Sequence, residues 1–259
     1  MLLAVNIENH YISFGIFEAN NLIGSFKIKT DINRSADELS FLIKNLLMER
    51  NISLKNIDDL IVSNVVPEML GIFEEISLYL FKKKIINVGR GTKSGLDIKC
   101  ESPKEVGADR ITRAVGALNI FKGPILVINM SSVTTIDYIN EKNQFMGGLI
   151  FPGIDLAQEI LKIESSKLPN VEISFSKKII GNTTSLAMKS GLYYSYINSV
   201  KGIIKDIEKS LGHKDFHIVL TGEFAHLLRD MENYNIYCDK DLNFKGLKII
   251  YDLNKTSAK

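Results

Sequence analysis

Cysteine is scarce in this sequence. Two of the 259 residues are cysteines, Cys100 and Cys238, and they form no CxxC pair. Small disulfide-linked domains and zinc sites need several closely spaced cysteines, so the sequence predicts neither a disulfide framework nor a zinc site. A reducing compartment is favoured, and we expect the protein to be cytoplasmic.

Long apolar runs and an excess of one charge are also lacking. No hydrophobic run reaches the roughly 18 residues of a membrane span, and residues 1–5 lack the basic start of a signal peptide. The formal net charge is +2, and no cluster of lysine and arginine alternates with aromatic residues. The sequence therefore predicts no membrane partner and no nucleic-acid partner.

The residues that are present have the composition of an ordinary globular protein. Hydrophobic residues make up 45% of the chain and charged residues 24%. A chain of 259 residues is longer than one compact core usually uses, so we expect two domains or one large one.

The order of the expected elements occurs twice along the chain. Alternation, apolar runs and turn residues predict three strands, a helix, a strand and a helix in each half. In the first half these are Leu2–Ile7, Tyr11–Phe17, Leu22–Ile28, a helix from Ser35, Asp59–Val65 and Met69–Phe81. In the second half they are Ile125–Met130, Val133–Asn140, Gln144–Phe151, helices near Gly153–Ile163 and Thr184–Leu211, the strand Phe216–Leu220 and the helix Glu223–Met231.

This repeat predicts an α/β protein of two similar halves, residues 1–122 and 123–259, around a central cleft that would bind a ligand. Each half has an asparagine at the end of its apolar first strand, Asn6 and Asn129. A buried polar group needs partners or a function. A single asparagine there is more often a turn residue, but two at matching places favour a shared site.

The most distinctive stretch is Pro103–Ile111, which places Gly107, Asp109 and Arg110 within four residues. Apolar residues at helical spacing follow it, so we expect a helix over Glu105–Phe121 with the charged pair in its first turns. An isolated Asp-Arg pair is more often a local charge pair on a helix. The expected cleft gives this one a ligand to face.

Further motifs occur in order along almost the whole chain. They are Ser63-Asn64-Val65-Val66-Pro67, Pro103 through Arg110, Thr134-Thr135-Ile136-Asp137, Gly147-Gly148 through Pro152-Gly153, Ala187-Met188-Lys189-Ser190-Gly191, Thr221-Gly222 and Gly246-Leu247-Lys248-Ile249-Ile250. With the duplicated halves, they resemble the sugar kinase, Hsp70 and actin superfamily, whose halves are ribonuclease-H-like (actin-like ATPase) folds. Within it the chain resembles the type III pantothenate kinases, and Glu105–Arg110 is the most specific segment.

The resemblance implies a reaction and its participants. The family phosphorylates pantothenate to 4'-phosphopantothenate from ATP, which is the first step of coenzyme A biosynthesis. It uses a divalent cation such as Mg²⁺ and a monovalent one, K⁺ or NH₄⁺. Its members are typically homodimers whose pantothenate pocket lies at the subunit interface.

The resemblance also implies roles for individual residues. Asp109 would be the general base that accepts the proton of the pantothenate hydroxyl, which suits phosphoryl transfer because that reaction needs positioning above all. The implied substrate-binding residues are Gly107, Ala108, Asp109, Arg110, Thr184 and Cys100. The implied ATP-binding residues are Asn6, Ile7, Glu8, Asn9, His10, Tyr11, Ile12, Ser13 and Ser132. Asn129 occupies the position of the monovalent-cation ligand.

The chain departs from the family pattern mainly on the nucleotide and cation side. The family has aspartate at the positions of Asn6 and Asn129, glycine at Glu8 and tyrosine at Cys100. Asparagine keeps the shape of aspartate but loses its charge, and hard cations prefer carboxylate oxygens. Glu8 adds bulk and a like charge where a backbone would approach a phosphate.

These departures leave three hypotheses open. The first is an active type III pantothenate kinase, even if a slow one. The second is a catalytically silent family member that acts as a binding or regulatory homodimer, and the third is a kinase with a shifted acceptor, which Cys100 would fit. Glu8 could also supply the carboxylate that Asn6 lacks, because both face one side of the strand. The sequence favours impaired nucleotide binding over that compensation.

Overall fold

A computed structural model of the chain describes residues 1–89, 91–165, 167–213, 215–228, 231 and 234–255. The chain forms two compact units. The first consists of Met1–Ile120 with Asp241–Lys259, and the second of Phe121–Lys240. The expected halves, 1–122 and 123–259, differ from these units in the assignment of residues 121–122 and 241–259. The C-terminal helix α6 (Leu242–Lys255) packs on α3 (Ala108–Ile120) within the first unit.

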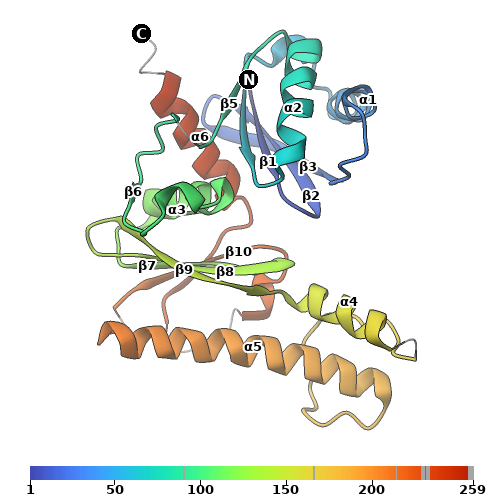
Figure 1. The fold of residues 1–259 in the computed structure, drawn as a ribbon, viewed down its shortest axis with the longest axis vertical. Coiled ribbons are helices and arrows are strands. Elements are labelled where there is room, and N and C mark those ends of the chain that lie inside the picture. The colour runs from blue at the N-terminus through green and yellow to red at the C-terminus, as the bar shows by residue number, and fades with distance from the viewer. Residues whose placement is uncertain (90, 166, 214, 229–230, 232–233, 256–259) are drawn as a thin grey trace. The chain divides into compact units, whose positions relative to one another are not determined.

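The first unit is built on one mixed sheet with helices on both of its faces (Figure 1). Its strands are β1 (Leu2–Ile7), β2 (Tyr11–Glu18), β3 (Asn21–Lys29), β4 (Asp59–Asn64) and β5 (Ile85–Asn87), in the order β3-β2-β1-β4-β5. Strand β1 pairs antiparallel with β2 and parallel with β4, and β5 continues the parallel part. Its helices α1 (Ala36–Met48) and α2 (Pro67–Ile76) are in contact.

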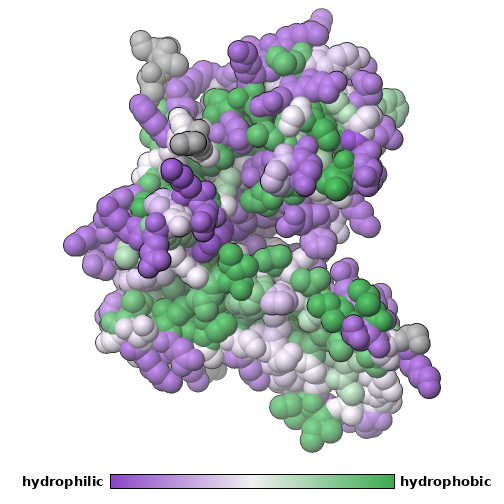
Figure 2. All heavy atoms as spheres, in the orientation of Figure 1, coloured by the Kyte–Doolittle hydropathy of each residue, from purple (hydrophilic) through white to green (hydrophobic). Residues whose placement is uncertain are grey.

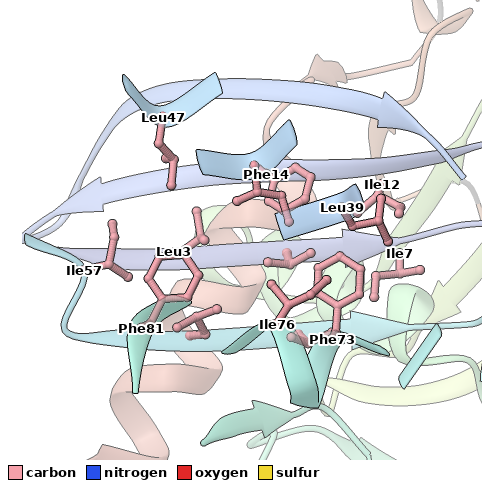
Figure 3. Close-up of a cluster of buried hydrophobic side chains, with 14 of the residues drawn as sticks. Leu3, Ile7, Ile12, Phe14, Leu39, Leu47, Ile57, Phe73, Ile76 and Phe81 are labelled. Carbon is pink, nitrogen blue, oxygen red and sulfur yellow. The ribbon is translucent and has the colours of Figure 1, made fainter. Parts of the chain in front are cut away.

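The strand alternation of β1 determines which side chains meet which helices. Leu3 and Ile7 point to the face covered by α1 and α2, where they join a cluster with Phe14, Leu39 and Phe73 (Figure 3). The intervening side chains, beginning with Leu2 and Ala4, lie on the opposite face with residues of α3 and α6. Both faces of the strand are therefore buried, as its unbroken apolar run predicts.

Helices α3 and α6 approach each other closely, and a glycine allows it. A Cβ atom at Gly246 of α6 would lie 1.8 Å from the backbone oxygen of Thr112 of α3, a distance that no side chain tolerates. The Thr112 hydroxyl also donates a hydrogen bond to the Asn243 side chain. The Gly246-Leu247 motif is thus explained by packing against the helix that carries Asp109.

The second unit repeats the topology of the first. Its strands are β7 (Ile125–Asn129), β8 (Val133–Ile139), β9 (Gln144–Pro152), β10 (His217–Thr221) and β11 (Ile236–Cys238), in the order β9-β8-β7-β10-β11. Helices α4 (Ile154–Glu164) and α5 (Thr184–Leu211) belong to this unit, and α5 buries Leu192, Tyr196 and Val200 against the sheet. The predicted duplication is confirmed by this matching strand order.

The predicted elements agree with the structure apart from three of the helices. The helix expected over Glu105–Phe121 begins only at Ala108, because Pro103–Glu105 forms a separate 3-10 turn. The helix expected to reach Phe81 is α-helical to Ile76 and continues as a π-helical turn over Ser77–Phe81. In place of the helix expected at Glu223–Met231, a 3-10 turn covers Ala225–Leu228, and residues 229 and 230 lie outside the described residues.

Two remaining elements are short: a 3-10 turn at Leu54–Asn56 and the strand β6 (Asp97–Ile98). Ser35 caps α1 as expected, since its hydroxyl accepts a hydrogen bond from the Glu38 N–H while the Glu38 carboxylate bonds back to the cap. Among the helices of the described residues, none combines the length and apolar content that a membrane span requires.

Candidate functional site

The predicted base, Asp109, lies in the first turn of α3. The Gly107 backbone oxygen accepts the first hydrogen bonds of this helix, from the N–H groups of Arg110 (3.0 Å) and Ile111 (3.1 Å). A Cβ atom at Gly107 would lie 2.6 Å from Asp109 Oδ1. The glycine of this motif therefore leaves room for the Asp109 carboxylate, which is 16% exposed.

Asp109 forms its ion pair with Arg113. One guanidinium nitrogen of Arg113, Nη2, contacts Asp109 Oδ2, and the other, Nη1, lies 3.2 Å from Oε1 of Glu8. The Arg113 side chain is buried, with 1% exposed. The sequence motif points to the adjacent Arg110 and not to Arg113, although the i,i+4 spacing of Arg113 from Asp109 is the one at which helical side chains meet.

Glu8, expected to face a phosphate, belongs to this charged cluster. Burial raises the pKa of the Glu8 carboxyl above its usual value, the Arg113 guanidinium lowers it, and the charge of Asp109 raises it again. The Asn6 side chain also hydrogen-bonds to the Glu8 carboxylate. The two residues therefore lie side by side, as their spacing on the strand predicts.

Two buried oxygens lie at the carboxyl ends of the parallel strands β1 and β4. Asn6 and Ser63 are partners in the β1–β4 register, so their side chains share one face of the sheet. Within the described part of the chain, Asn6 Oδ1 and Ser63 Oγ have no hydrogen-bond partner. Ligands of open α/β sheets bind beyond this edge, and such orphaned oxygens suit a ligand donor or the water shell of a cation.

The other expected ATP-binding residues surround the β1–β2 turn. Asn9 and His10 are exposed. Ile7 and Ile12 have fully buried side chains in the apolar core. Tyr11 and Ser13 are half-buried on β2, and Ser13 is the register partner of Asn6.

In the second unit, Asn129 is held by its immediate neighbours. Its Oδ1 accepts a hydrogen bond from the Ser131 hydroxyl at 3.0 Å, and its Nδ2 donates to the Val133 backbone oxygen at 3.4 Å. Thr135 is its register partner on β8, and the buried Thr135 hydroxyl has no hydrogen-bond partner within the described segments. These oxygens are neutral, so the donor set fits a large monovalent cation better than a small divalent one.

Ser132 and Thr134 also have defined partners. The Ser132 hydroxyl donates a hydrogen bond to Asp155 Oδ2 at the start of α4. The Thr134 hydroxyl lies 2.7 Å from the hydroxyl of Tyr196 on α5, and burial raises the pKa of Tyr196 to about 12. Thr134 therefore ties the sheet to α5, whereas Thr135 points to the other face.

The last two expected substrate residues lie at or near the surface. Thr184 is exposed at the first position of α5, next to Thr183, whose hydroxyl caps the helix by accepting from the Leu186 N–H. Cys100 is half-buried. Over the described residues, no group of three or more His, Cys, Asp or Glu side chains is arranged to hold a metal ion.

Solved structures of related shape define the class of protein. A conserved Baf-family protein from Campylobacter jejuni matches with a TM-score of 0.60 and 21% identity, covering 98% of this chain and 99% of its own. The activator of 2-hydroxyisocaproyl-CoA dehydratase from Clostridium difficile, solved with ADPNP, has a TM-score of 0.57, 12% identity and coverage of 99% and 96%. An ROK hexokinase from Thermus thermophilus has a TM-score of 0.51, 10% identity and coverage of 99% and 99%. The duplicated α/β halves are thus those of the actin-like ATPase and sugar kinase fold, and the predicted fold class is confirmed.

Sequence comparison narrows this class to a family. Residues 2–206 match the family model of type III pantothenate kinase. A type III pantothenate kinase from Exiguobacterium sp. strain AT1b is 35% identical over 255 residues, which cover 98% of this chain and 100% of that protein. The chain belongs to the type III pantothenate kinase family.

Proposed function

We propose that the protein phosphorylates pantothenate to 4'-phosphopantothenate with ATP as the phosphoryl donor. The observation that carries the proposal is the Asp109 carboxylate at the start of α3, given room by Gly107 and bound by a buried arginine. Family membership supplies the substrate and the donor. A fixed carboxylate that remains partly exposed is what a base acting on an alcohol requires.

In this proposal each residue near Asp109 has a separate task. Asp109 orients the attacking hydroxyl and accepts its proton. Arg110 binds the pantothenate carboxylate, for which a planar guanidinium is well suited. Gly107 and Ala108 line the same site, and Thr184 and Cys100 contribute further substrate contacts.

The proposed cofactors are ATP, Mg²⁺ and K⁺ or NH₄⁺. ATP would bind at the Asn6–Ser13 segment and at Ser132, where Asn6 Oδ1 and Ser63 Oγ offer acceptors to the hydrated Mg²⁺ of the nucleotide. Asn129 Oδ1 and the Thr135 hydroxyl would hold the monovalent cation, since both are neutral oxygens on one face of the sheet. Bound Mg²⁺ supplies charge neutralisation for the transferring phosphoryl group.

We further propose that turnover is slow. A single preorganised electrostatic group typically contributes about 10²–10³-fold to the rate, and both Asn6 and Asn129 lack the charge that the family pattern expects. Glu8 is a smaller obstacle than the sequence suggested, because its carboxylate is directed to Arg113 at 3.2 Å.

The test is a phosphorylation assay of the purified full-length protein with ATP, pantothenate, Mg²⁺ and K⁺ or NH₄⁺. We expect 4'-phosphopantothenate to form, and Asp109→Asn to lower kcat by about 10²–10³-fold because the base is lost. Asn6→Asp and Asn129→Asp should each raise the rate. Melting curves of each variant would serve as the control for folding.

Absence of product under all these conditions, with the two aspartates restored, would refute the proposal and leave the silent binding or regulatory homodimer. Phosphorylation of another alcohol in place of pantothenate would instead indicate the shifted acceptor that Cys100 suggested. A full rate without the restoring substitutions would contradict only the slow turnover.

We also propose that the protein is a cytoplasmic homodimer. Figure 2 shows apolar residues gathered on parts of the surface, and in the second unit several large ones are exposed. These are Met146, Leu149 and Ile150 of β9, Ile160 and Ile163 of α4, and Ile179 and Ile180 beyond it. Exposed large apolar side chains gathered on one unit commonly mark a protein interface, and a second copy of this chain is the occupant that we propose.

A further inference from the structure

Arg113 has a buried positive charge that two carboxylates share. Its side chain is 1% exposed, with Nη1 3.2 Å from Glu8 Oε1 and Nη2 in contact with Asp109 Oδ2. A buried guanidinium is strongly destabilising when a partner is removed, because an uncompensated charge remains. The planar fork of arginine lets it hold two carboxylates at once. Arg113 therefore links the expected base to the end of the first strand.

The two carboxylates come from separate elements. Asp109 is one helical turn before Arg113 on α3, whereas Glu8 is 105 residues away in sequence and follows β1. The Glu8 backbone is fixed on both sides: its N–H donates to the Tyr11 oxygen at 3.0 Å, and its oxygen accepts from the Thr30 hydroxyl at 2.6 Å. The position of Glu8 beside Arg113 is thus set by the turn itself.

The charges around Glu8 explain why it needs Arg113. Its neighbours are Arg113 and Asp109 from α3 and the Asn6 side chain from β1. When both acids are ionised, the cluster has one negative charge in excess, and its carboxylates repel each other. Arg113 offsets that repulsion, and its guanidinium lowers the pKa of the Glu8 carboxyl and so favours the ionised form of Glu8.

We propose that Arg113 is a positioning residue for Asp109 and that Glu8 is the counter-ion of Arg113, not a residue directed at nucleotide phosphates. Arg113 holds Oδ2 of Asp109, and the other oxygen, Oδ1, lies beside Gly107. The inference rests on the proposed function, since it concerns the base of that reaction. It deepens that function by assigning a task to Arg113, which had none, and a different task to Glu8.

The proposed role of Glu8 reverses the effect that the sequence alone predicts for the substitution Glu8→Gly. Glu8→Gly would restore the residue that the family pattern expects. If the Glu8 carboxylate repelled the phosphates of ATP, this substitution would improve ATP binding. If Glu8 instead balances Arg113, the same substitution removes one of the two carboxylates that pair with the guanidinium. We therefore expect Glu8→Gly to lower the melting temperature and not to improve ATP binding.

A double-mutant cycle tests the pairing in the full-length protein. The variants are Glu8→Gln, Arg113→Gln, their combination and Arg113→Lys, with Arg34→Gln as the control. Arg34 has a similar ion pair with Asp31 in the same unit, at 3.7 Å, but at the surface. The measurements are kcat, KM for ATP and for pantothenate, and the melting temperature.

We expect Arg113→Gln to lower kcat by about 10²-fold through displacement of Asp109, with KM for ATP changed less than about twofold. Arg113→Lys should recover part of kcat, because it keeps the charge but loses the fork. Glu8→Gln should lower the melting temperature, and adding it to Arg113→Gln should cost nothing further, because the pair is already broken. The control should match the wild type.

Additive effects of the two substitutions, an unchanged kcat in Arg113→Gln, or a lower KM for ATP in Glu8→Gln would each overturn the inference. If Arg113→Gln does not fold, Arg113→Lys and Glu8→Gln give the same readouts. If the wild type forms no product, the proposed function fails separately. The inference is then judged by the melting temperatures and by carbon-13 NMR signals of the Asp109 and Glu8 carboxyl groups, which must both shift in Arg113→Lys.

Discussion

At the scale of single residues, Asp109 depends on a neighbour on each side in the sequence. Gly107 leaves space for one carboxylate oxygen, because any Cβ there would lie 2.6 Å from Oδ1. Arg113 binds the other oxygen. The glycine of the motif is therefore needed for the shape of the site, and the aspartate for its chemistry.

Gly107→Ala tests this requirement for space. The added methyl group must displace either the carboxylate or the start of α3, so we expect kcat for pantothenate phosphorylation to fall by about 10²-fold. Gly71→Ala on α2 is the matched control, because no atom lies within 4 Å of the added Cβ. That variant should keep full activity and melt at the same or a slightly higher temperature. Equal activity of the two variants would show that Asp109 does not need the space.

At the scale of elements, the strand ends carry the polar groups and the helices hold them in place. Asn6 and Ser63 end neighbouring parallel strands of the first sheet, and Asn129 and Thr221 are register partners in the second. Because the two sheets have the same order, the asparagines occupy equivalent positions. The equivalent positions of the two asparagines thus follow from the duplicated topology.

The contact between β8 and α5 predicts a dependence of stability on pH. Burial raises the pKa of Tyr196 to about 12, from an ordinary value of 10.0. The neutral phenol is therefore favoured in the folded state, and its contribution is fully present below pH 10 and lost as the pH rises towards 12. One pKa unit corresponds to about 1.4 kcal/mol, so the loss is about 2–3 kcal/mol.

Urea unfolding of the wild type and of Tyr196→Phe between pH 8 and about 12 would measure this effect. The wild type should lose its stability advantage over the variant between about pH 10 and 12. A difference that stays constant across this range would mean that the Tyr196 hydroxyl ionises as easily in the folded as in the unfolded protein.

At the scale of the whole molecule, an exposed apolar surface sets the expected assembly. Ile150 of β9 is 60% exposed, and apolar side chains of β9 and α4 are exposed around it in sequence. If this surface is the dimer interface, a charge in its middle should separate the subunits. We expect Ile150→Glu to give a monomer by light scattering at concentrations where the wild type is a dimer.

Phe41→Glu is the control for that experiment, because Phe41 is 69% exposed on α1 of the first unit and outside the proposed interface. It should leave the dimer intact. A monomeric wild type, or a dimeric Ile150→Glu, would contradict the proposed assembly.

The sequence by itself determined the local structure and its duplication. Apolar runs and turn residues predict the ends of the expected strands to within one or two residues, and Ser35 with Glu38 predicts the start of α1. These signals can be seen in the sequence because they act over a few neighbouring residues. The glycine, aspartate and arginine of residues 107–110 were likewise visible as a motif. Family membership follows from the order of such motifs.

Only the tertiary structure decided which distant residues meet. That α6 packs in the first unit depends on the close approach that Gly246 permits to α3, and no pattern within residues 242–255 shows it. The sequence alone predicts that the charge of Glu8 repels a bound phosphate, because its partner Arg113 lies 105 residues further along the chain. An ion pair between separate elements depends on the packing of both, and so the meaning of Glu8 could not be read from its own neighbours.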